Sequence, residues 1–188
     1  MRASAGCVVL VYCCGAAAAD PHVVVRGVAP GEARWTAGFW KQRFDVCRTA
    51  TVPHLWRVMR GKEYSQYLEN FRVAAGLSEG RHRGAAFNDG DFYKWLEAAI
   101  VVNAAAPEPT LAAAIEEAVT AIRAAQRADG YLHTRVQIRQ KQGDANARPF
   151  RDPLQFEAYN LGHLMTAACV RQRLTGRNDL LDVARKAA

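Results

Sequence analysis

Residues 91–128 read DFYKWLEAAIVVNAAAPEPTLAAAIEEAVTAIRAAQRA and contain two helical patterns of different character. The first, from Asp91 to about Ala105, is apolar on nearly all sides, which is typical of a helix buried between layers. The second, from Thr110 to about Ala128, carries a single apolar stripe and turns its charged residues to water. This alternation predicts an all-α chain with an inner and an outer layer of helices. It favours an α/α toroid over an irregular helical bundle.

Helical patterns also continue outward from this stretch in both directions. Toward the N-terminus, we expect a helix over 39–60 that Pro53 breaks or kinks, and a shorter helix over 64–75. Toward the C-terminus, we expect helices over 154–174 and from 178 onward. The segments 80–90 and 131–148 are expected to be irregular, and His22–Val25 is a candidate short strand. The chain therefore contains a succession of helices with no convincing sheet.

The first twenty residues differ from the rest in composition. Arg2 is followed by the apolar run from Ala5 to Cys14 and then by small residues up to Ala19. This order is typical of a secretory signal peptide, with cleavage before Asp20. The run is too short to cross a bilayer, which needs roughly 20 residues. We therefore predict a signal at 1–19, one domain over 20–188, a secreted or periplasmic location, and no membrane span.

Charge and cysteine content exclude several classes of function. The net charge is +7, but the Lys and Arg residues are scattered, and the densest cluster is Arg81-His82-Arg83. A continuous basic face is absent from this pattern, so no nucleic-acid partner is expected. After removal of the signal, Cys47 and Cys169 remain, and they form no metal-binding spacing. Buried free thiols are the favoured interpretation, and a bridge between the two is the alternative.

One face of the 154–174 helix combines aromatic, amide and imidazole groups. At 100° per residue this face holds Phe156, Tyr159, Asn160 and His163. Such a face suits a sugar pocket, because rings can stack on a sugar and polar groups can bind its hydroxyls. Taken by themselves, these residues fit better as a buried His and Asn whose polar atoms bond backbone groups, because most buried polar groups are structural.

Two further segments carry polar residues for which structural roles are expected. Asp89 or Asp91 is expected to cap the helix that follows, and Lys94 to pair with Glu97. His133 is expected to lie exposed in the loop after the second helix. No phosphate-binding loop, His-Glu-x-x-His motif or nucleophile elbow is present in the sequence.

Several segments together resemble glycoside hydrolase family 127, the β-L-arabinofuranosidases and their relatives. The matching segments follow the family order and cover nearly all of the chain after the signal. They are Gly38-Phe39-Trp40, Glu69 to Gly76, Asn88 to Ala98, Ala125-Gln126 with Asp129 to Leu132, Glu157 to Leu164, and Thr175-Gly176.

The resemblance implies an (α/α)6 toroid and a retaining hydrolase of terminal L-arabinofuranosides in plant-type glycans. It also implies a cysteine nucleophile held by zinc in a site of one Glu and three Cys, with a second Glu as acid/base. Those residues lie downstream of the matched part, so no catalytic residue and no zinc ligand is carried over to this chain. His163 matches a histidine that lines the sugar subsite, and Tyr159 and Asn160 share its face. The family often has His-Glu where this chain has Phe156-Glu157.

Two alternatives to an active arabinofuranosidase stay open. One is a non-catalytic, truncated product, because only about the first half of a toroid is expected here and no hydrolysis is expected from it alone. The other is a different (α/α)6 carbohydrate enzyme, such as an epimerase or an unsaturated-glycan hydrolase. A homodimer of the full-length protein is also left open.

Overall fold

The computed structural model describes residues 27–188. The expected signal peptide at 1–19 and the candidate strand at His22–Val25 lie outside the described residues. Within 27–188 no β-strand forms, and the only strand-like pairing is an isolated bridge between Pro30 and Ala33 around the turn at Gly31. The all-α class predicted from the sequence is confirmed.

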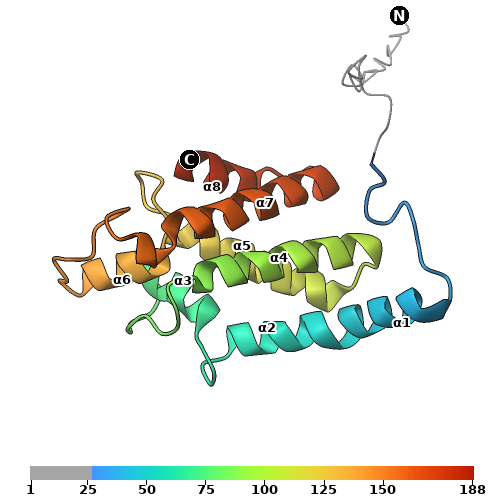
Figure 1. Ribbon diagram of the computed structural model, residues 1–188. Coiled ribbons are helices and arrows are strands. Elements are labelled where there is room, and N and C mark those ends of the chain that lie inside the picture. The colour runs from blue at the N-terminus through green and yellow to red at the C-terminus, as the bar shows by residue number, and fades with distance from the viewer. Residues whose placement is uncertain (1–26) are drawn as a thin grey trace, which may run out of the picture.

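Helices account for most of the described chain (Figure 1). In chain order they are α1 (Gly38–Val46), the π-helix η1 (Cys47–Thr51), α2 (Val52–Arg60), α3 (Tyr67–Ala75), α4 (Asn88–Ala105), α5 (Pro109–Ala125), α6 (Thr134–Lys141), the 3-10 turn η2 (Pro153–Gln155), α7 (Glu157–Thr175) and α8 (Asp179–Ala187).

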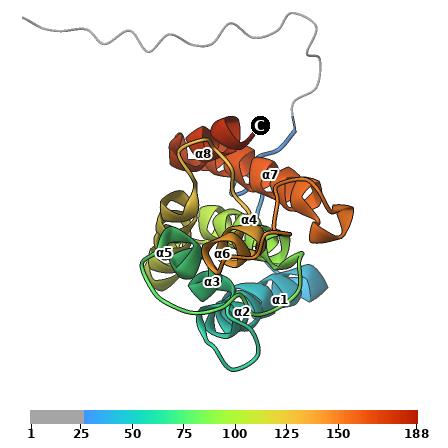
Figure 2. The ribbon, with the colours of Figure 1, turned by 90° about the vertical axis from the view of Figure 1, so that its left-hand side faces the viewer.

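Six of these helices form two layers that alternate along the chain. Helix α4 packs against α2 on one side and α7 on the other, which makes the first layer. Helix α5 packs in the same way between α3 and α8, which makes the second layer. The pairs α2–α3, α4–α5 and α7–α8 connect the layers, and the second layer lies to the left of the first in Figure 2. The predicted alternation of buried and one-sided helices therefore corresponds to two real layers.

The core is built around the aromatic side chains of α4. The rings of Trp95 and Trp56 stack with centroids 4.7 Å apart, and Phe92 lies 5.2 Å from Phe71 of α3. The indole N–H of Trp95 donates to the Val52 carbonyl at 3.2 Å, so burial of this ring leaves no polar group unpaired. Helix α4 is thus held on several sides, as its apolar sequence predicts.

The helix expected over 39–60 is present, with an irregular turn directly ahead of Pro53. Helices α1 and α2 form one continuous helical segment through η1 (Figure 1). In η1 the Val52 N–H donates to the Cys47 carbonyl. A π-helical turn holds one residue more than an α-helical turn. It therefore keeps Cys47 and Val52 against the same core although they are five positions apart. The break or kink predicted at Pro53 is confirmed as this π-helical turn. Proline lacks an N–H for the helical hydrogen bonds, which accounts for the irregularity.

Several helix boundaries differ from the sequence prediction: α3 begins at Tyr67 rather than Tyr64, and α7 begins at Glu157 rather than Leu154. Helix α4 begins at Asn88 rather than Asp91, and α5 ends at Ala125 rather than Ala128. The segment 131–148, expected to be irregular, contains α6, so that prediction was wrong. The His133 Nδ1 accepts the Val136 N–H at 3.3 Å and starts this helix, which is too short and too polar to show an apolar period.

None of the described helices has the length and apolar character needed to cross a membrane.

Candidate functional site

The first turns of α4 and α7 approach each other closely at Gly90. A Cβ atom at this position would lie 2.6 Å from the Asn160 Oδ1 and 3.0 Å from the Tyr159 ring. Only glycine leaves room for α7 here. The contact brings the polar residues at the start of both helices onto one face of the first layer.

Asn160, one of the three residues predicted to bind sugar, is buried in this contact. Its Oδ1 accepts the Gly90 N–H at 2.9 Å, and its Nδ2 donates to the Ala86 carbonyl at 3.0 Å. The amide is only 1% exposed, and it ties α7 to the N-terminus of α4. The direct sugar contact of Asn160 stays a prediction, and the bonds described give the amide a positioning role.

Tyr159 and His163 lie together on the exposed side of α7. Their rings meet edge to face with centroids 4.7 Å apart, and Tyr159 is 42% exposed. His163 is half-buried. The structure therefore brings two of the three predicted residues to one accessible surface, one turn apart.

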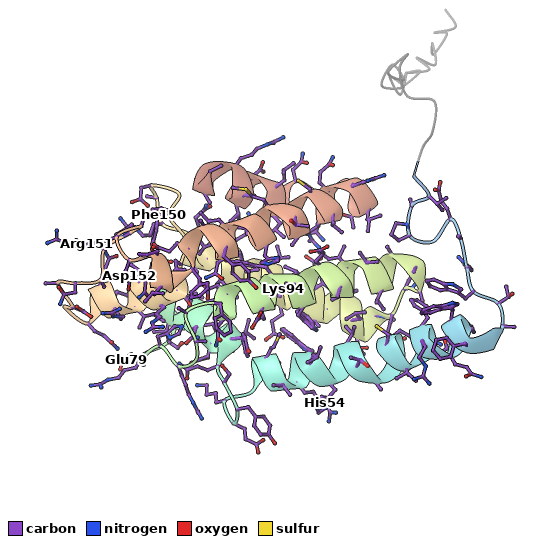
Figure 3. The ribbon with its side chains drawn as sticks, viewed as in Figure 1. His54, Glu79, Lys94, Phe150, Arg151 and Asp152 are labelled. Carbon is purple, nitrogen blue, oxygen red and sulfur yellow. The ribbon has the colours of Figure 1, made fainter. Side chains whose placement is uncertain are left out.

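Lys94 of α4 completes this surface from the neighbouring helix. Its Nζ donates to the Tyr159 hydroxyl and, at 3.0 Å, to the Asp91 Oδ1. Figure 3 shows the side chain between α4 and α7. The hydrogen bonds to Tyr159 and Asp91 raise the pKa of Lys94, so its charge persists at neutral pH. The expected pairing of Lys94 with Glu97 is corrected, because the ammonium group points back along α4 to Asp91 and across to α7.

A series of rings extends the same surface toward the start of α7. Phe87 contacts Phe156 at 5.8 Å, and Phe156 contacts Tyr159 at 6.0 Å, both edge to face. Phe87 and Phe156 are 42% and 40% exposed. Phe156 was expected inside this helix. It instead lies directly before α7 and has a left-handed φ of 58°. A bulky residue rarely adopts this conformation, so the backbone is strained where it presents this ring.

A buried carboxylate supports the loop before α7. Glu157 is 5% exposed and accepts hydrogen bonds from the Tyr131 hydroxyl and from the Phe150 N–H at 2.9 Å. Burial, reinforced by the bond to Glu157, raises the pKa of Tyr131 well above its usual range. Phe150, Arg151 and Asp152 lie on this loop, at the α6 end of the molecule (Figure 3).

Asp89 and His133 have other roles than those expected. Asp89 does not cap α4: it is buried, and its carboxylate accepts from the Thr134 N–H at 2.7 Å and from the Thr134 hydroxyl at 2.6 Å. His133 was expected to be exposed but is 1% exposed, and its Nε2 contacts the Ala86 carbonyl at 3.3 Å. Both residues hold α6 to the start of α4. This long-range pairing leaves no local signal in the sequence.

The described residues do not match a zinc site of one Glu and three Cys. Within 27–188 no group of three or more His, Cys, Asp or Glu could hold a metal ion. Cys47 and Cys169 are both free. Cys169 is exposed, which corrects the expectation that it is buried, while Cys47 is half-buried in η1.

Lys94 and Phe87 belong to this surface but were not predicted to, since Lys94 was expected only to pair with Glu97. For Lys94 a signal was available, since it is a lone cation on a helix that is otherwise apolar on nearly all sides. Phe87 lies in a segment expected to be a loop, where an aromatic residue has no periodic pattern to identify it.

Comparison with known proteins assigns the fold to a family. The sequence model of the β-L-arabinofuranosidase catalytic domain of glycoside hydrolase family 127 matches residues 32–188. The chain belongs to glycoside hydrolase family 127. The resemblance seen in the sequence is thereby confirmed, and the two alternating layers are part of the α/α toroid of this family.

Relatives in glycoside hydrolase family 127 are much longer than this chain. A non-reducing end β-L-arabinofuranosidase of Bifidobacterium longum subsp. longum is 35% identical over 171 residues, which cover 81% of this chain and 26% of that protein. The crystal structure of a family 127 β-L-arabinofuranosidase from Geobacillus stearothermophilus T6 has a TM-score of 0.73 and 34% identity, covering 80% of this chain and 24% of that one. A second family 127 β-arabinofuranosidase structure has a TM-score of 0.70 and 31% identity, covering 82% of this chain and 25% of its own. The chain thus spans about a quarter of the length of the relatives it matches.

Proposed function

We propose that this chain is the N-terminal, substrate-binding part of a retaining glycoside hydrolase that removes terminal L-arabinofuranosyl residues from plant-type glycans. Membership of glycoside hydrolase family 127 supports the reaction class, and the relative from Bifidobacterium longum carries the name of this activity. An extracellular or periplasmic location, expected from residues 1–19, is part of the same proposal.

The observation that carries the proposal is the surface formed by Tyr159, His163 and Lys94. Rings supply a face for the C–H groups of a sugar, while the imidazole, phenol and ammonium groups can bind its hydroxyls. These groups come from two helices that Gly90 and Asn160 hold together. Their relative positions are therefore fixed before a substrate binds, which lowers the cost of binding.

The zinc-bound cysteine nucleophile remains part of the proposal, with its ligands and the acid/base Glu supplied by residues outside this chain. Zinc would keep such a thiol deprotonated at neutral pH. Because Cys47 and Cys169 do not form the ligand set, we derive no chemical step through zinc from this chain.

The test is the replacement His163→Ala in the complete gene product. The wild-type protein is expected to hydrolyse methyl and aryl β-L-arabinofuranosides. The variant is expected to lose about 10- to 100-fold in kcat/KM, the equivalent of one or two hydrogen bonds to the sugar. Initial rates at several substrate concentrations measure this loss.

His54→Ala is the matched control. His54 is also a histidine on a first-layer helix, but it is exposed on α2 and points away from α4 and α7 (Figure 3). It should leave kcat/KM unchanged. Equal activity of the His163 variant and the wild type would remove His163 from the sugar site. Turnover of other glycosides with none of arabinofuranosides would assign the chain to another substrate class.

A further inference from the structure

The Lys94 side chain is held in place by contacts to two helices, although it lies at the surface. Its neighbours on α4, Tyr93 and Trp95, are buried in the core, while the Lys94 side chain is 41% exposed. The ammonium group reaches across to α7, where it bonds the Tyr159 hydroxyl and lies 4.9 Å from the centroid of the Tyr159 ring. The positions of Asp91 and Tyr159 thus fix the charge between two helices.

A count of donors shows what this arrangement leaves free. A lysine ammonium has three N–H donors. Among residues 27–188 its acceptors are Asp91 and Tyr159, so one donor has no protein partner there. The Tyr159 oxygen accepts from Lys94, which leaves the phenol O–H itself able to donate. The surface next to His163 therefore offers two oriented donors.

Stability alone does not account for this geometry. Ion pairs between exposed groups contribute little to stability, because solvent screens them and ordering a lysine costs rotamer entropy. The Asp91 and Lys94 side chains are 30% and 41% exposed. The contacts to Asp91 and Tyr159 instead orient a positively charged donor that a neutral sugar hydroxyl beside His163 could accept from.

We propose that Lys94 donates a hydrogen bond to one hydroxyl of the bound sugar and is a specificity-determining residue of this site. The inference rests on the proposed function for the nature of the sugar. Asp91 and Tyr159 act as positioning residues, because they hold the ammonium group in place and leave its third N–H for the substrate.

The experiment measures Lys94→Met in the complete gene product against a set of substrates. The set contains methyl β-L-arabinofuranoside and its 2-deoxy, 3-deoxy and 5-deoxy analogues. Lys94→Met should lower kcat/KM for the parent sugar by about 10- to 100-fold, as expected for a hydrogen bond from a charged donor. For the analogue that lacks the contacted hydroxyl, the same replacement should cost less than about threefold, because the bond is already missing.

Lys62→Met serves as the control. Lys62 also pairs with a carboxylate, Glu69, at 2.9 Å, but it is 65% exposed and precedes α3, outside this surface. It should change kcat/KM for none of the four sugars. Thermal melting of all variants checks that they are folded.

An equal loss on every analogue, or no loss on the parent, overturns the role of Lys94 and leaves the proposed function intact. If the wild type does not hydrolyse arabinofuranosides, the proposed function fails. Binding of the same four sugars is then measured by isothermal titration calorimetry. A loss confined to the sugars that carry one particular hydroxyl supports Lys94, and the absence of binding or of selectivity overturns it.

Discussion

Arg171 is a fully buried charge, with 2% of its surface exposed, where α5, α7 and α8 meet. Its Nε donates to Asp179 at 2.7 Å, and its other donors reach both Asp179 and Glu116. A guanidinium removed from water is tolerated only with such partners. The bond from Arg171 lowers the pKa of Asp179 to about 2.

The lowered pKa of Asp179 predicts how stability depends on pH. Because the folded-state pKa is about 2 against an ordinary value of 3.8, the contribution is complete above pH 4 and is lost as the pH falls toward 2. Asp179→Asn is expected to cost about 1–3 kcal/mol at pH 7, with Glu116 still bound to Arg171. Below pH 3 the difference from the wild type should narrow. Thermal melts from pH 7 to pH 2.5 measure this.

Asp182→Asn is the comparison for that experiment. Asp182 lies on the same helix but is 66% exposed and only loosely paired with Arg185, at 3.5 Å. Its replacement should change the free energy of unfolding by less than about 0.5 kcal/mol. Identical melting curves for the two variants would show that the Arg171 contact contributes nothing.

At the scale of elements, the contact between α4 and α7 decides where the candidate site forms. Both helices begin with a polar turn, and Asn160 bonds the backbone on either side of the α4 start. The close approach at Gly90 is what aligns Lys94 with Tyr159. Tyr159 is contacted by His163 of its own helix and by Lys94 of α4.

Replacing each of two helical glycines by alanine tests this contact, because the two changes should shift the free energy of unfolding in opposite directions. Gly90→Ala should destabilise the protein by about 1–3 kcal/mol, because its Cβ would meet Asn160 at 2.6 Å. Gly162→Ala should stabilise it by about 0.5–1 kcal/mol, because no atom lies within 4 Å and alanine favours a helix. Chemical denaturation of both variants gives the two signs. A stabilising Gly90→Ala would mean that the helices can separate at no cost.

At the scale of the whole molecule, large apolar side chains of α1 remain exposed. Phe39 and Trp40 are 62% and 66% exposed, and Val46 is 48% exposed. A groove of about 510 Å³, lined on α1 by Phe44, opens between the segment before α1 and the end of α4. Apolar patches of this kind on a chain by itself promote association.

We expect residues 20–188, produced alone, to self-associate. Light scattering after size exclusion should give a mass that rises with concentration. The double replacement of Phe39 and Trp40 by Ser should lower that mass. Leu77→Ser is the control, since Leu77 is 69% exposed and lies after α3, away from α1. A monomer at all concentrations would contradict the expectation.

The sequence by itself determined the all-α class, the two layers and most helix boundaries, because these depend on local periodicity and on Pro and Gly. It also placed Tyr159 and His163 on one side of α7, since residues one helical turn apart share a face. The family followed from short segments in a fixed order. These are properties that neighbouring residues carry without reference to the rest of the chain.

Only the tertiary structure decided the partners of the polar residues. Asp89 bonds Thr134 rather than its own helix, Lys94 bonds Tyr159 across to α7, and His133 is buried. The strained Phe156 and helix α6 were likewise missed. Polar groups bond whichever partner the fold brings near. A partner lies 45 or more residues away in the sequence for Asp89, Lys94 and the amide of Asn160. A local pattern cannot specify such distances, so the chemistry of the surface emerges only when α4 and α7 pack.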